Sequence, residues 1–553
     1  MKKKLIPVLA AAAGILLVFA GALGMEFLQK YMPSKEPSDL GRLLGVEGEA
    51  TAVFLNNERQ KEDGITRDGQ TYLSLEWVNQ YLNERFYWDD VEKLLVYTLP
   101  DTIVYADKRT QGQGGQPLLL EEEGQIYLAA GLVGSYTDIQ TEAYNTDEHK
   151  RIYIDNTWAP RQMGTARSDT AVREKGGIKS PVITTVQKGD SFQILEQMTD
   201  WAKVRTEDGY IGYLQNRRIG SVETVQDVSL FIEPVYTSIS LEEGVCLGWH
   251  QVLSEADNQN LEALAAHAEG MNVIAPTWLM LTDNEGNYHS WASREYVDQA
   301  HAMGLQVWAV LDNFNMGDEV NSEILFARTS VRKKLIESLM ADAETYDLDG
   351  INLDIEGIRP EAGPHYVQFI RELSVACRNQ GVILSVDNYV PSSSTEFYNR
   401  AEQGRVADYV IVMAYDEHHA GGEAGSVSSL PFVERGIEET AREVPAEKLV
   451  AAVPFYTRVW TEKDGETTSS ALGIEGAKNW IEEHQVELTW QEETGQYYGE
   501  LQTEEGLKRV WMEEETSLGL KMDLIRQNEL AGVACWKLGF EPASVWDVIG
   551  GNE

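Results

Sequence analysis

The first pattern along the chain is an apolar run. The twenty positions from Leu5 to Gly24 carry no polar side chain, and Lys2, Lys3 and Lys4 precede them. A helix rises 1.5 Å per residue, so this run spans about 30 Å, the thickness of a bilayer core. The basic flank keeps the first residues in the cytoplasm and places the remainder outside. We expect residues 1–28 to be a membrane anchor, or a signal peptide cleaved near residues 20–22.

Residues 29–44 are mostly polar and predict a short linker. Residues 45–158 then carry an internal repeat, because DGQTYL at 68–73 returns as EGQIYL at 123–128. Each copy predicts a turn, a strand, a short helix and a second strand, hence a small α+β repeat domain. This region resembles the N-terminal domain of copper amine oxidases. The resemblance implies no copper here, because the metal of those oxidases belongs to another domain and no histidine cluster occurs.

Residues 166–225 alternate in short β-prone pieces separated by turn signals, a pattern typical of a small β-barrel. The series ends in GYIGYL at 209–214, and it resembles a bacterial SH3 domain of the kind that targets cell walls. Trp201, Tyr210 and Tyr213 are candidates for a ligand groove. The alternative is that they form the core of the barrel, the commoner place for aromatic side chains in so small a domain.

From residue 240 to residue 553 buried strands alternate with helical stretches, as in parallel sheets joined by helices. Eight strands in about 300 residues predict an α/β fold, the (β/α)₈ TIM barrel. Residues 464–518 are too long for one helix and contain β-prone pieces, which predicts an inserted α+β lobe beside the cleft. The expected strands are Val245–His250, Met271–Leu281, Gln306–Asp312, Gly350–Gly357, Ile383–Tyr389, Tyr409–Asp416, Leu449–Tyr456 and Gly532–Leu538.

The fourth of these strands carries polar side chains, although buried parallel strands are normally apolar on both faces. Alternation places Asn352, Asp354 and Glu356 on one face and three aliphatic residues on the other. Because the aliphatic face packs on helices, the polar face points into the barrel and steps toward its carboxyl-terminal mouth. Unpaired buried acids are costly, so we interpret them as functional. The alternative is an internal polar cluster whose hydrogen bonds are satisfied.

Residues 349–356 resemble the strand-four signature of glycoside hydrolase family 18, Asp-x-x-Asp-x-Asp-x-Glu. Asp349, Asn352, Asp354 and Glu356 occupy its four positions. The asparagine departs from the commonest pattern and is similar to the branch of spore-cortex and peptidoglycan glucosaminidases. Two further motifs of the family are matched by MAYD at 413–416, in strand six, and by GVACWKLG at 532–539, in strand eight.

The resemblance implies a retaining hydrolysis in which the 2-acetamido oxygen of the substrate attacks the anomeric carbon. Glu356 is then the acid that protonates the leaving oxygen. Asp354 raises the pKa of Glu356 and orients the acetamido group, and Tyr415 donates a hydrogen bond to the acetamido oxygen. The expected substrate-binding residues are Asp416, Trp536, Met413, Asn352 and Asp349, with Trp278 and Asn388 at the barrel rim, where loop capping is an equal alternative.

Charge and composition limit the classes of partner that we expect the protein to bind. Asp and Glu number 89 and Lys and Arg 46, which gives a net charge of −43 and argues against nucleic acid and against docking of the bulk protein on anionic lipid. Three scattered cysteines are too few for a disulfide framework or a zinc cluster. We expect no metal and no cofactor.

These features together predict an extracytoplasmic glycosidase that cleaves peptidoglycan or a related cell-wall polysaccharide. The protein would be held at the cell membrane by its N-terminal helix, or secreted. Chitin oligomers are the alternative substrate. A non-catalytic glycan-binding protein on the same barrel is the alternative function, and the presence of Glu356, commonly lost in such lectins, favours the enzyme.

Overall fold

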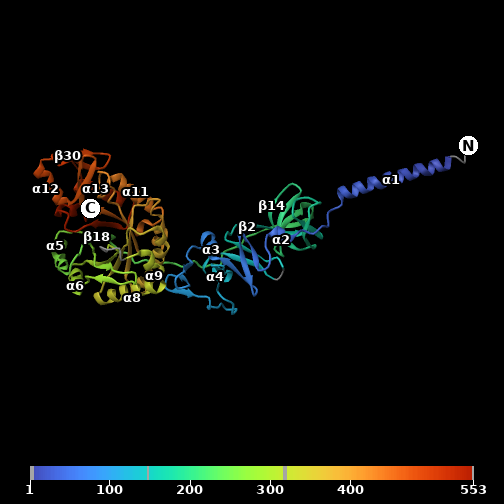
Figure 1. Ribbon diagram of the computed structural model, residues 1–553, viewed down its shortest axis with the longest axis horizontal. Coiled ribbons are helices and arrows are strands. Elements are labelled where there is room, and N and C mark those ends of the chain that lie inside the picture. The colour runs from blue at the N-terminus through green and yellow to red at the C-terminus, as the bar shows by residue number, and fades with distance from the viewer. Residues whose placement is uncertain (1–4, 146–147, 315–319, 551–553) are drawn as a thin grey trace. The chain divides into compact units, whose positions relative to one another are not determined.

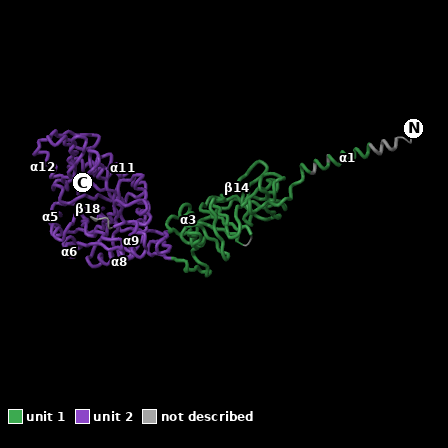
Figure 2. Tube along the Cα trace, in the orientation of Figure 1, with its two compact units in different colours: residues 1–86, 106–233 green, residues 87–105, 234–553 purple. Residues whose placement is uncertain are grey.

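The computed structural model describes residues 5–145, 148–314 and 320–550. It divides into two compact units, residues 1–86 with 106–233 and residues 87–105 with 234–553 (Figures 1 and 2). Helix α1 (Leu5–Tyr31) contains the stretch Ala12–Tyr31, which is long and apolar enough to cross a membrane. Lys2, Lys3 and Lys4, on which the predicted topology depends, lie outside the described residues.

The first module of unit 1 is a seven-stranded sheet in the order β7-β8-β3-β2-β1-β10-β9. The two repeats meet in it, because β3 and β8 pair antiparallel and each runs directly into a short helix. The resemblance to the copper amine oxidase domain stays a prediction. The elements are α2 (Leu40–Leu44), β1 (Ala50–Leu55), β2 (Glu58–Arg67), β3 (Gln70–Ser74), α3 (Leu75–Tyr81), β7 (Leu119–Glu122), β8 (Gln125–Ala129), α4 (Ala130–Tyr136), β9 (Gln140–Tyr144) and β10 (Arg151–Asp155).

The second module of unit 1 is a seven-stranded β-structure in the order β13-β12-β16-β15-β14-β11-β17. Tyr210 lies neither in its core nor in a free groove. It is buried against the first module, where the Arg151 guanidinium lies 3.9 Å from its ring centre. Trp201 and Tyr213 are half-buried. The strands are β11 (Arg161–Ala166), β12 (Thr170–Arg173), β13 (Val182–Val186), β14 (Ser191–Gln197), β15 (Trp201–Thr206), β16 (Ile211–Gln215) and β17 (Ile219–Val225).

Unit 2 contains a closed barrel of eight parallel strands, so the predicted (β/α)₈ fold is confirmed. The first strand pairs with the second and also with the last, which closes the ring. The strands are β18 (Val245–His250), β19 (Val273–Pro276), β22 (Gln306–Asp312), β23 (Gly350–Asp354), β24 (Ile383–Tyr389), β25 (Tyr409–Met413), β26 (Leu449–Pro454) and β32 (Gly532–Trp536). The second predicted strand is divided, because β20 (Leu279–Leu281) separates from β19 and pairs with β21 (Tyr288–Ser290).

Helices surround these strands (Figure 1). Side-chain alternation divides the apolar residues into two cores. One core lies between strands and helices and includes Ile351, Leu353 and Ile355, whereas the other fills the barrel interior and includes Trp249 and Trp308. The helices are α5 (Leu261–Ala265), α6 (Arg294–Ala302), α7 (Ser322–Ala327), α8 (Thr329–Tyr346), α9 (Gly363–Gln380), α10 (Arg400–Val406), α11 (Leu430–Thr440), α13 (Glu515–Gln527) and α14 (Trp546–Ile549).

A five-stranded antiparallel sheet, in the order β28-β27-β31-β30-β29, follows the seventh barrel strand. It begins at Tyr456 and its last strand ends at Met512, so the inserted lobe starts and ends earlier than the expected 464–518. The sequence estimate missed that β27 continues almost directly from β26, and it included the start of α13, which contacts barrel strands. The elements are β27 (Tyr456–Lys463), β28 (Glu466–Gly473), α12 (Ile474–His484), β29 (Leu488–Gln491), β30 (Gln496–Thr503) and β31 (Gly506–Met512).

A second departure from the predicted domains concerns residues 87–105. They form a small sheet of β4 (Tyr87–Asp89), β5 (Leu94–Thr98) and β6 (Ile103–Ala106) that belongs to the barrel unit. The repeat domain is therefore not continuous over 45–158. The reason is tertiary: the side chains of this segment bond to α8 and α9, for example Gln368 to Thr98 at 3.1 Å.

Candidate active site

Three aspartates stand side by side on the inner face of the barrel. Asp312 of β22 is in register with Asp354 of β23, and the pairing of Leu353 with Val386 places Asp354 beside Asp387 of β24. Neighbouring strands lie about 4.8 Å apart, so the three carboxyl groups form one row. Their residues are only 6%, 6% and 2% exposed. We call Asp312, Asp354 and Asp387 the carboxyl row.

Glu356 lies two residues beyond Asp354, toward the mouth. Its backbone is held by the Asn313 side chain, which accepts from the Glu356 N–H at 2.9 Å and donates to the Glu356 carbonyl at 2.8 Å. Tyr389 accepts a hydrogen bond from the N–H of Gly357 at 3.1 Å, and its hydroxyl also bonds to the Glu356 carboxyl. The position of Glu356 is thus set from two neighbouring strands.

Burial shifts the pKa values of this cluster upward. Burial raises the pKa of Asp312 to about 6, and burial, followed by the charges of Asp387, Glu356 and Asp312, holds the pKa of Asp354 well above its ordinary value. The pKa of Glu356 is also raised, by burial first. The hydrogen bonds of Glu356 with Tyr389 and with Asp354 oppose this rise. Desolvation is therefore the main cause of the raised Glu356 pKa, instead of the expected Asp354 charge.

Asn352 lies beneath the carboxyl row and is fully buried. Its amide nitrogen donates to the Ser385 hydroxyl at 2.9 Å and to Asp387 Oδ1 at 2.8 Å. Its oxygen accepts from the Trp249 indole at 3.0 Å. Both N–H donors of the amide and one acceptor position of its oxygen are used inside the barrel. Asn352 therefore supports the row from below, and the expected contact with substrate is not available to it.

The loop that follows β25 brings a tyrosine to the same end of the barrel. Val410, Val412 and Ala414 belong to the outer core, so alternation turns Met413 and Tyr415 inward. Burial and the charges of Asp354, Glu356 and Asp387 hold the pKa of Tyr415 well above its ordinary value, which keeps the phenol a hydrogen-bond donor. Met413 is buried one layer below.

Asp416 and Trp536 complete the mouth. Asp416 is exposed, and its carboxyl accepts a hydrogen bond from the hydroxyl of Tyr456, the first residue of the inserted lobe. Trp536 ends β32 and is half-buried. Its ring centre lies 5.9 Å from that of Trp249, at an interplanar angle of 61°. An aromatic face thus stands near the acids, as expected for a wall against a sugar ring.

Comparison with known proteins agrees with this geometry. Residues 317–541 match the model of glycosyl hydrolases family 18, and residues 168–219 match that of a bacterial SH3 domain. The barrel is a family 18 glycoside hydrolase domain. The expected resemblance to this family and to SH3 domains is confirmed.

Curated relatives and solved structures share the family 18 barrel. The chain is 27% identical to the uncharacterized glycosylase YvbX of Bacillus subtilis over 336 residues, 58% of this chain and 96% of that protein. It is 27% identical to the cortical fragment-lytic enzyme of the same organism over 246 residues, but spans only 57% of that protein's length. These relatives and the family support a glycosidase.

Two crystal structures show the same fold. The chitinase of Chromobacterium violaceum superposes with a TM-score of 0.51 at 20% identity, covering 56% of this chain and 99% of that one. The spore cortex-lytic enzyme SleL of Bacillus cereus superposes with a TM-score of 0.51 at 18% identity, covering 59% and 76%.

Three expected substrate-binding residues of the family 18 domain lie away from its mouth. Asp349 precedes β23 at the opposite end of the barrel, where its carboxyl accepts from the His301 imidazole and from the Val307 N–H, both at 2.8 Å. Trp278 is fully buried in the outer core, and its indole donates to the Asn258 side chain. Asn388 points to the helices and exchanges hydrogen bonds with Gln403. Each of these residues lies near the end of a barrel strand in the sequence, but that position does not show which way its side chain points.

Asp312 and Asp387 lie at or near the ends of their strands, at the expected catalytic rim, where the sequence leaves loop capping and substrate contact as equal alternatives. The signal that singles them out is the register of three adjacent strands, which a sequence alone does not contain.

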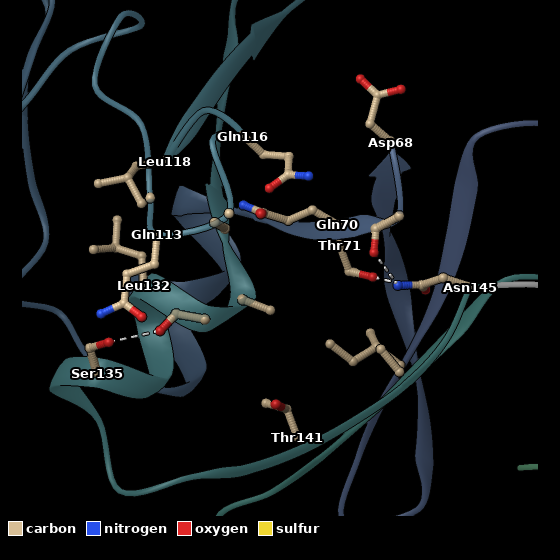
Figure 3. Close-up of a pocket in the computed structure, with 18 residues that line it drawn as sticks. Asp68, Gln70, Thr71, Gln113, Gln116, Leu118, Leu132, Ser135, Thr141 and Asn145 are labelled. Atoms are coloured by element: carbon tan, nitrogen blue, oxygen red, sulfur yellow. Dashed lines mark hydrogen bonds between the residues drawn. The ribbon is translucent and has the colours of Figure 1, made fainter.

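The first module of unit 1 holds a different cavity, of about 670 Å³ (Figure 3). Uncharged side chains dominate its lining, among them Gln70, Gln113, Gln116 and Asn145, with Asp68 the one acidic side chain. Thr71 donates to the Asn145 amide oxygen at 3.0 Å, and the Asn145 nitrogen donates to the Gly69 carbonyl at 3.0 Å.

Proposed function

We propose that the family 18 barrel cleaves β-linked N-acetylglucosamine in cell-wall polysaccharide, with retention of configuration and with the substrate's acetamido group as nucleophile. The observation that carries the proposal is the hydrogen bond between Asp354, which is buried, and Glu356, which is half-buried, two acids with raised pKa values at the carboxyl-terminal end of the barrel. In this arrangement Glu356 acts as general acid on the glycosidic oxygen. A raised pKa favours the protonated form of the carboxyl, which that role requires.

The spacing of the acids supports a nucleophile that comes from the substrate. Retaining glycosidases with a carboxylate nucleophile hold two carboxyl groups about 5–5.5 Å apart, one on each side of the scissile bond. Asp354 is instead hydrogen-bonded to Glu356 and lies below it, nearly excluded from solvent. It is therefore poorly placed to attack an anomeric carbon.

Tyr415 and Asp354 would align the acetamido group. The phenol, kept protonated, would donate to the acetamido oxygen, and Asp354 would accept from the acetamido N–H as positive charge develops on the ring that forms. Trp536 would support the sugar from below and Asp416 would bind a hydroxyl. These interactions grow stronger toward the transition state, so they favour turnover more than ground-state binding.

Cell-wall glycan is favoured as the substrate by the SH3 module and by relatives named as cortical fragment-lytic enzymes. The N-terminal apolar helix supports an extracytoplasmic place of action, either anchored or secreted. Chitin is the second candidate, because a chitinase shares the fold.

Product analysis tests the proposal. The protein without residues 1–28 is incubated with purified peptidoglycan and with chitin oligomers, and the products are identified by mass spectrometry. New reducing-end N-acetylglucosamine from peptidoglycan is expected, with slower release from chitin. Tight binding to either glycan without any product would favour the lectin alternative and would contradict the proposal.

A further inference from the structure

Two buried oxygen atoms on neighbouring strands have no hydrogen-bond partner among the residues that the structure describes. They are Asp354 Oδ1 and Asp387 Oδ2. Their residues are lateral neighbours in the carboxyl row, and both are nearly excluded from solvent. Two adjacent carboxylates cannot both ionise at such a place without a large cost. A single proton between the two oxygens would satisfy both.

Asn352 determines which oxygen of Asp387 can carry that proton. Its amide nitrogen donates to Asp387 Oδ1 at 2.8 Å, so Oδ1 is an acceptor. A proton on this carboxyl therefore resides on Oδ2, the atom without a partner. Asn352 cannot itself exchange a proton with Asp354, because an amide does not titrate.

We propose that Asp387 is a positioning residue that stays neutral and donates its Oδ2–H to Asp354 Oδ1, so that Asp354 is the ionised member of the cluster and Glu356 retains the catalytic proton. The proposal rests on the proposed function of Glu356. Three acids then share two protons. One proton lies on Asp387 and one on Glu356, and both are directed at a single carboxylate, Asp354. If Asp387 were ionised, the two protons would lie on Asp354 and Glu356, and Glu356 would no longer face a carboxylate at Asp354.

The surroundings of Asp387 favour its neutral form. Burial is the main reason that its pKa lies well above the ordinary value, the charge of Glu356 adds to it, and the Asn352 hydrogen bond opposes both. Among the described residues, the titratable groups that interact with this carboxyl are acidic or phenolic: Asp354 (β23), Glu356 in the loop after β23, Tyr366 (α9) and Tyr415 in the loop after β25.

Asp312, the other neighbour of Asp354, is a weaker candidate for this role. One of its oxygens accepts the N–H of Phe314 at 3.1 Å, and neither is a buried atom without a partner. Its pKa of about 6 also leaves it ionised at neutral pH. The unpaired oxygen atoms therefore favour Asp387 over Asp312 as the neutral donor to Asp354.

Two substitutions separate a hydrogen-bond donor from a charge. In Asp387→Asn the amide oxygen can still accept from Asn352 and the amide N–H can donate to Asp354, with no proton to lose. We expect kcat within about threefold of wild type. Asp387→Ala leaves Asp354 Oδ1 and the Asn352 N–H without partners, and we expect kcat to fall roughly tenfold to a hundredfold with KM nearly unchanged.

The pH profile distinguishes this role from packing alone. In the wild type the alkaline limb of kcat reports a proton lost from three coupled carboxyls, and in Asp387→Asn the same charge is confined to two. The negative charges that remain after the proton is lost repel one another more strongly when two carboxyl groups hold them than when three do. Loss of the proton is therefore harder in Asp387→Asn, and its alkaline limb should move to higher pH. Asp349→Asn, an equal-sized exchange at the opposite end of β23, is the control and should leave the limb in place. An unchanged limb in Asp387→Asn, or a loss of kcat as large as in Asp387→Ala, would overturn the proposal.

Infrared difference spectroscopy tests the protonation state without turnover. At neutral pH the spectrum of wild type minus Asp387→Asn should contain a band of a protonated carboxyl, and that of wild type minus Asp349→Asn should not. Absence of the band in an active wild-type enzyme would refute the role of Asp387 and leave the proposed function standing. A wild type that cleaves neither glycan would refute the proposed function, whereas the band would still report on Asp387. If Asp387→Ala fails to fold, the pH profile of Asp387→Asn and the infrared difference spectrum still test the proposal.

Discussion

One carboxyl oxygen of Asp89 accepts hydrogen bonds from both the backbone N–H and the hydroxyl of Thr329, each at 2.6 Å, although 240 residues separate them. Thr329 is the first residue of α8, so Asp89 acts as a helix cap supplied by a distant part of the chain. The other Asp89 oxygen accepts from the N–H groups of Val91 and Glu92. The barrel is thus completed by a segment that precedes it by more than a hundred residues.

Replacement of Asp89 should destabilise the barrel. Asp89→Ala leaves the α8 N-terminus without its cap, and caps contribute about 0.5–2 kcal/mol. We expect a lower midpoint for the barrel transition in urea, measured by tryptophan fluorescence. Asp90→Ala is the matched control, because the Asp90 side chain is 79% exposed and its only salt bridge, to Lys93, is on the surface. Equal midpoints for the two variants would contradict the capping role.

A barrel fragment of residues 234–553 should fold poorly for the same reason. Without residues 87–105 the buried pair of Arg332 and Glu372 loses the Tyr87 ring that covers the guanidinium at 4.8 Å. The fragment also loses the Asp89 cap of α8 and the Thr98 acceptor of Gln368, which leaves polar groups of the barrel without their partners. The fragment should be recovered mainly as aggregate, whereas residues 29–553 should be soluble. A stable, monomeric fragment with the full chain's melting temperature would show that the segment is dispensable.

Glu356→Gln should abolish turnover while leaving glycan binding nearly intact. The amide has the same shape but cannot protonate the leaving oxygen, and loss of one acid–base group typically lowers rates by about 10²–10⁴-fold. Reducing-end release measures the rate, and sedimentation with insoluble glycan measures binding. Glu361→Gln, an exchange at an exposed residue of the following loop, should behave as wild type. Wild-type turnover by Glu356→Gln would remove this residue from the mechanism.

Substrate assistance predicts a requirement for the acetyl group. De-N-acetylated polymer should bind but resist cleavage, a thiazoline analogue of the cyclised intermediate should inhibit strongly, and fresh product should retain the β configuration by NMR. Tyr415→Phe should lower kcat more than it raises KM. Tyr409→Phe is a control on the same strand, since the Tyr409 hydroxyl accepts from the Leu241 N–H at the far end of the barrel. Inversion, or equal cleavage of de-acetylated polymer, would exclude this mechanism.

The raised pKa of Asp312 predicts how stability varies with pH. The folded protein holds this proton up to about pH 6, whereas the unfolded chain releases it near pH 3.8. The stabilisation by the proton is complete below pH 3.8 and is lost as the pH rises toward 6, by about 3 kcal/mol in all. Urea unfolding between pH 4 and pH 7 should therefore show a smaller decline for Asp312→Asn than for wild type. Asp298→Asn, on the surface of α6, should keep the wild-type slope.

Removal of residues 1–28 should yield a soluble and active protein. In cells the full chain should sediment with membranes and be degraded by protease added from outside. An intact chain in the cytosol, with its N-terminus retained, would contradict the expected topology.

The sequence by itself determined which face of each barrel strand points inward. Alternation depends only on neighbours along the chain, so the inward direction of Asn352, Asp354 and Glu356 follows from the aliphatic residues between them. The series of strands and helices likewise determined the barrel, because eight such units in one domain close in one common way.

Tertiary structure decided which residues meet. The row of Asp312, Asp354 and Asp387 depends on the register of three strands that are dozens of residues apart. The cap on Thr329 depends on residue 89, which lies 240 residues earlier in the chain. Trp278 and Asn388 lie at strand ends as expected, but they face the helices and are covered. Register and burial arise from packing between distant segments, and that packing also sets the desolvation that raises the pKa values of the acids. No local pattern of residues carries this information.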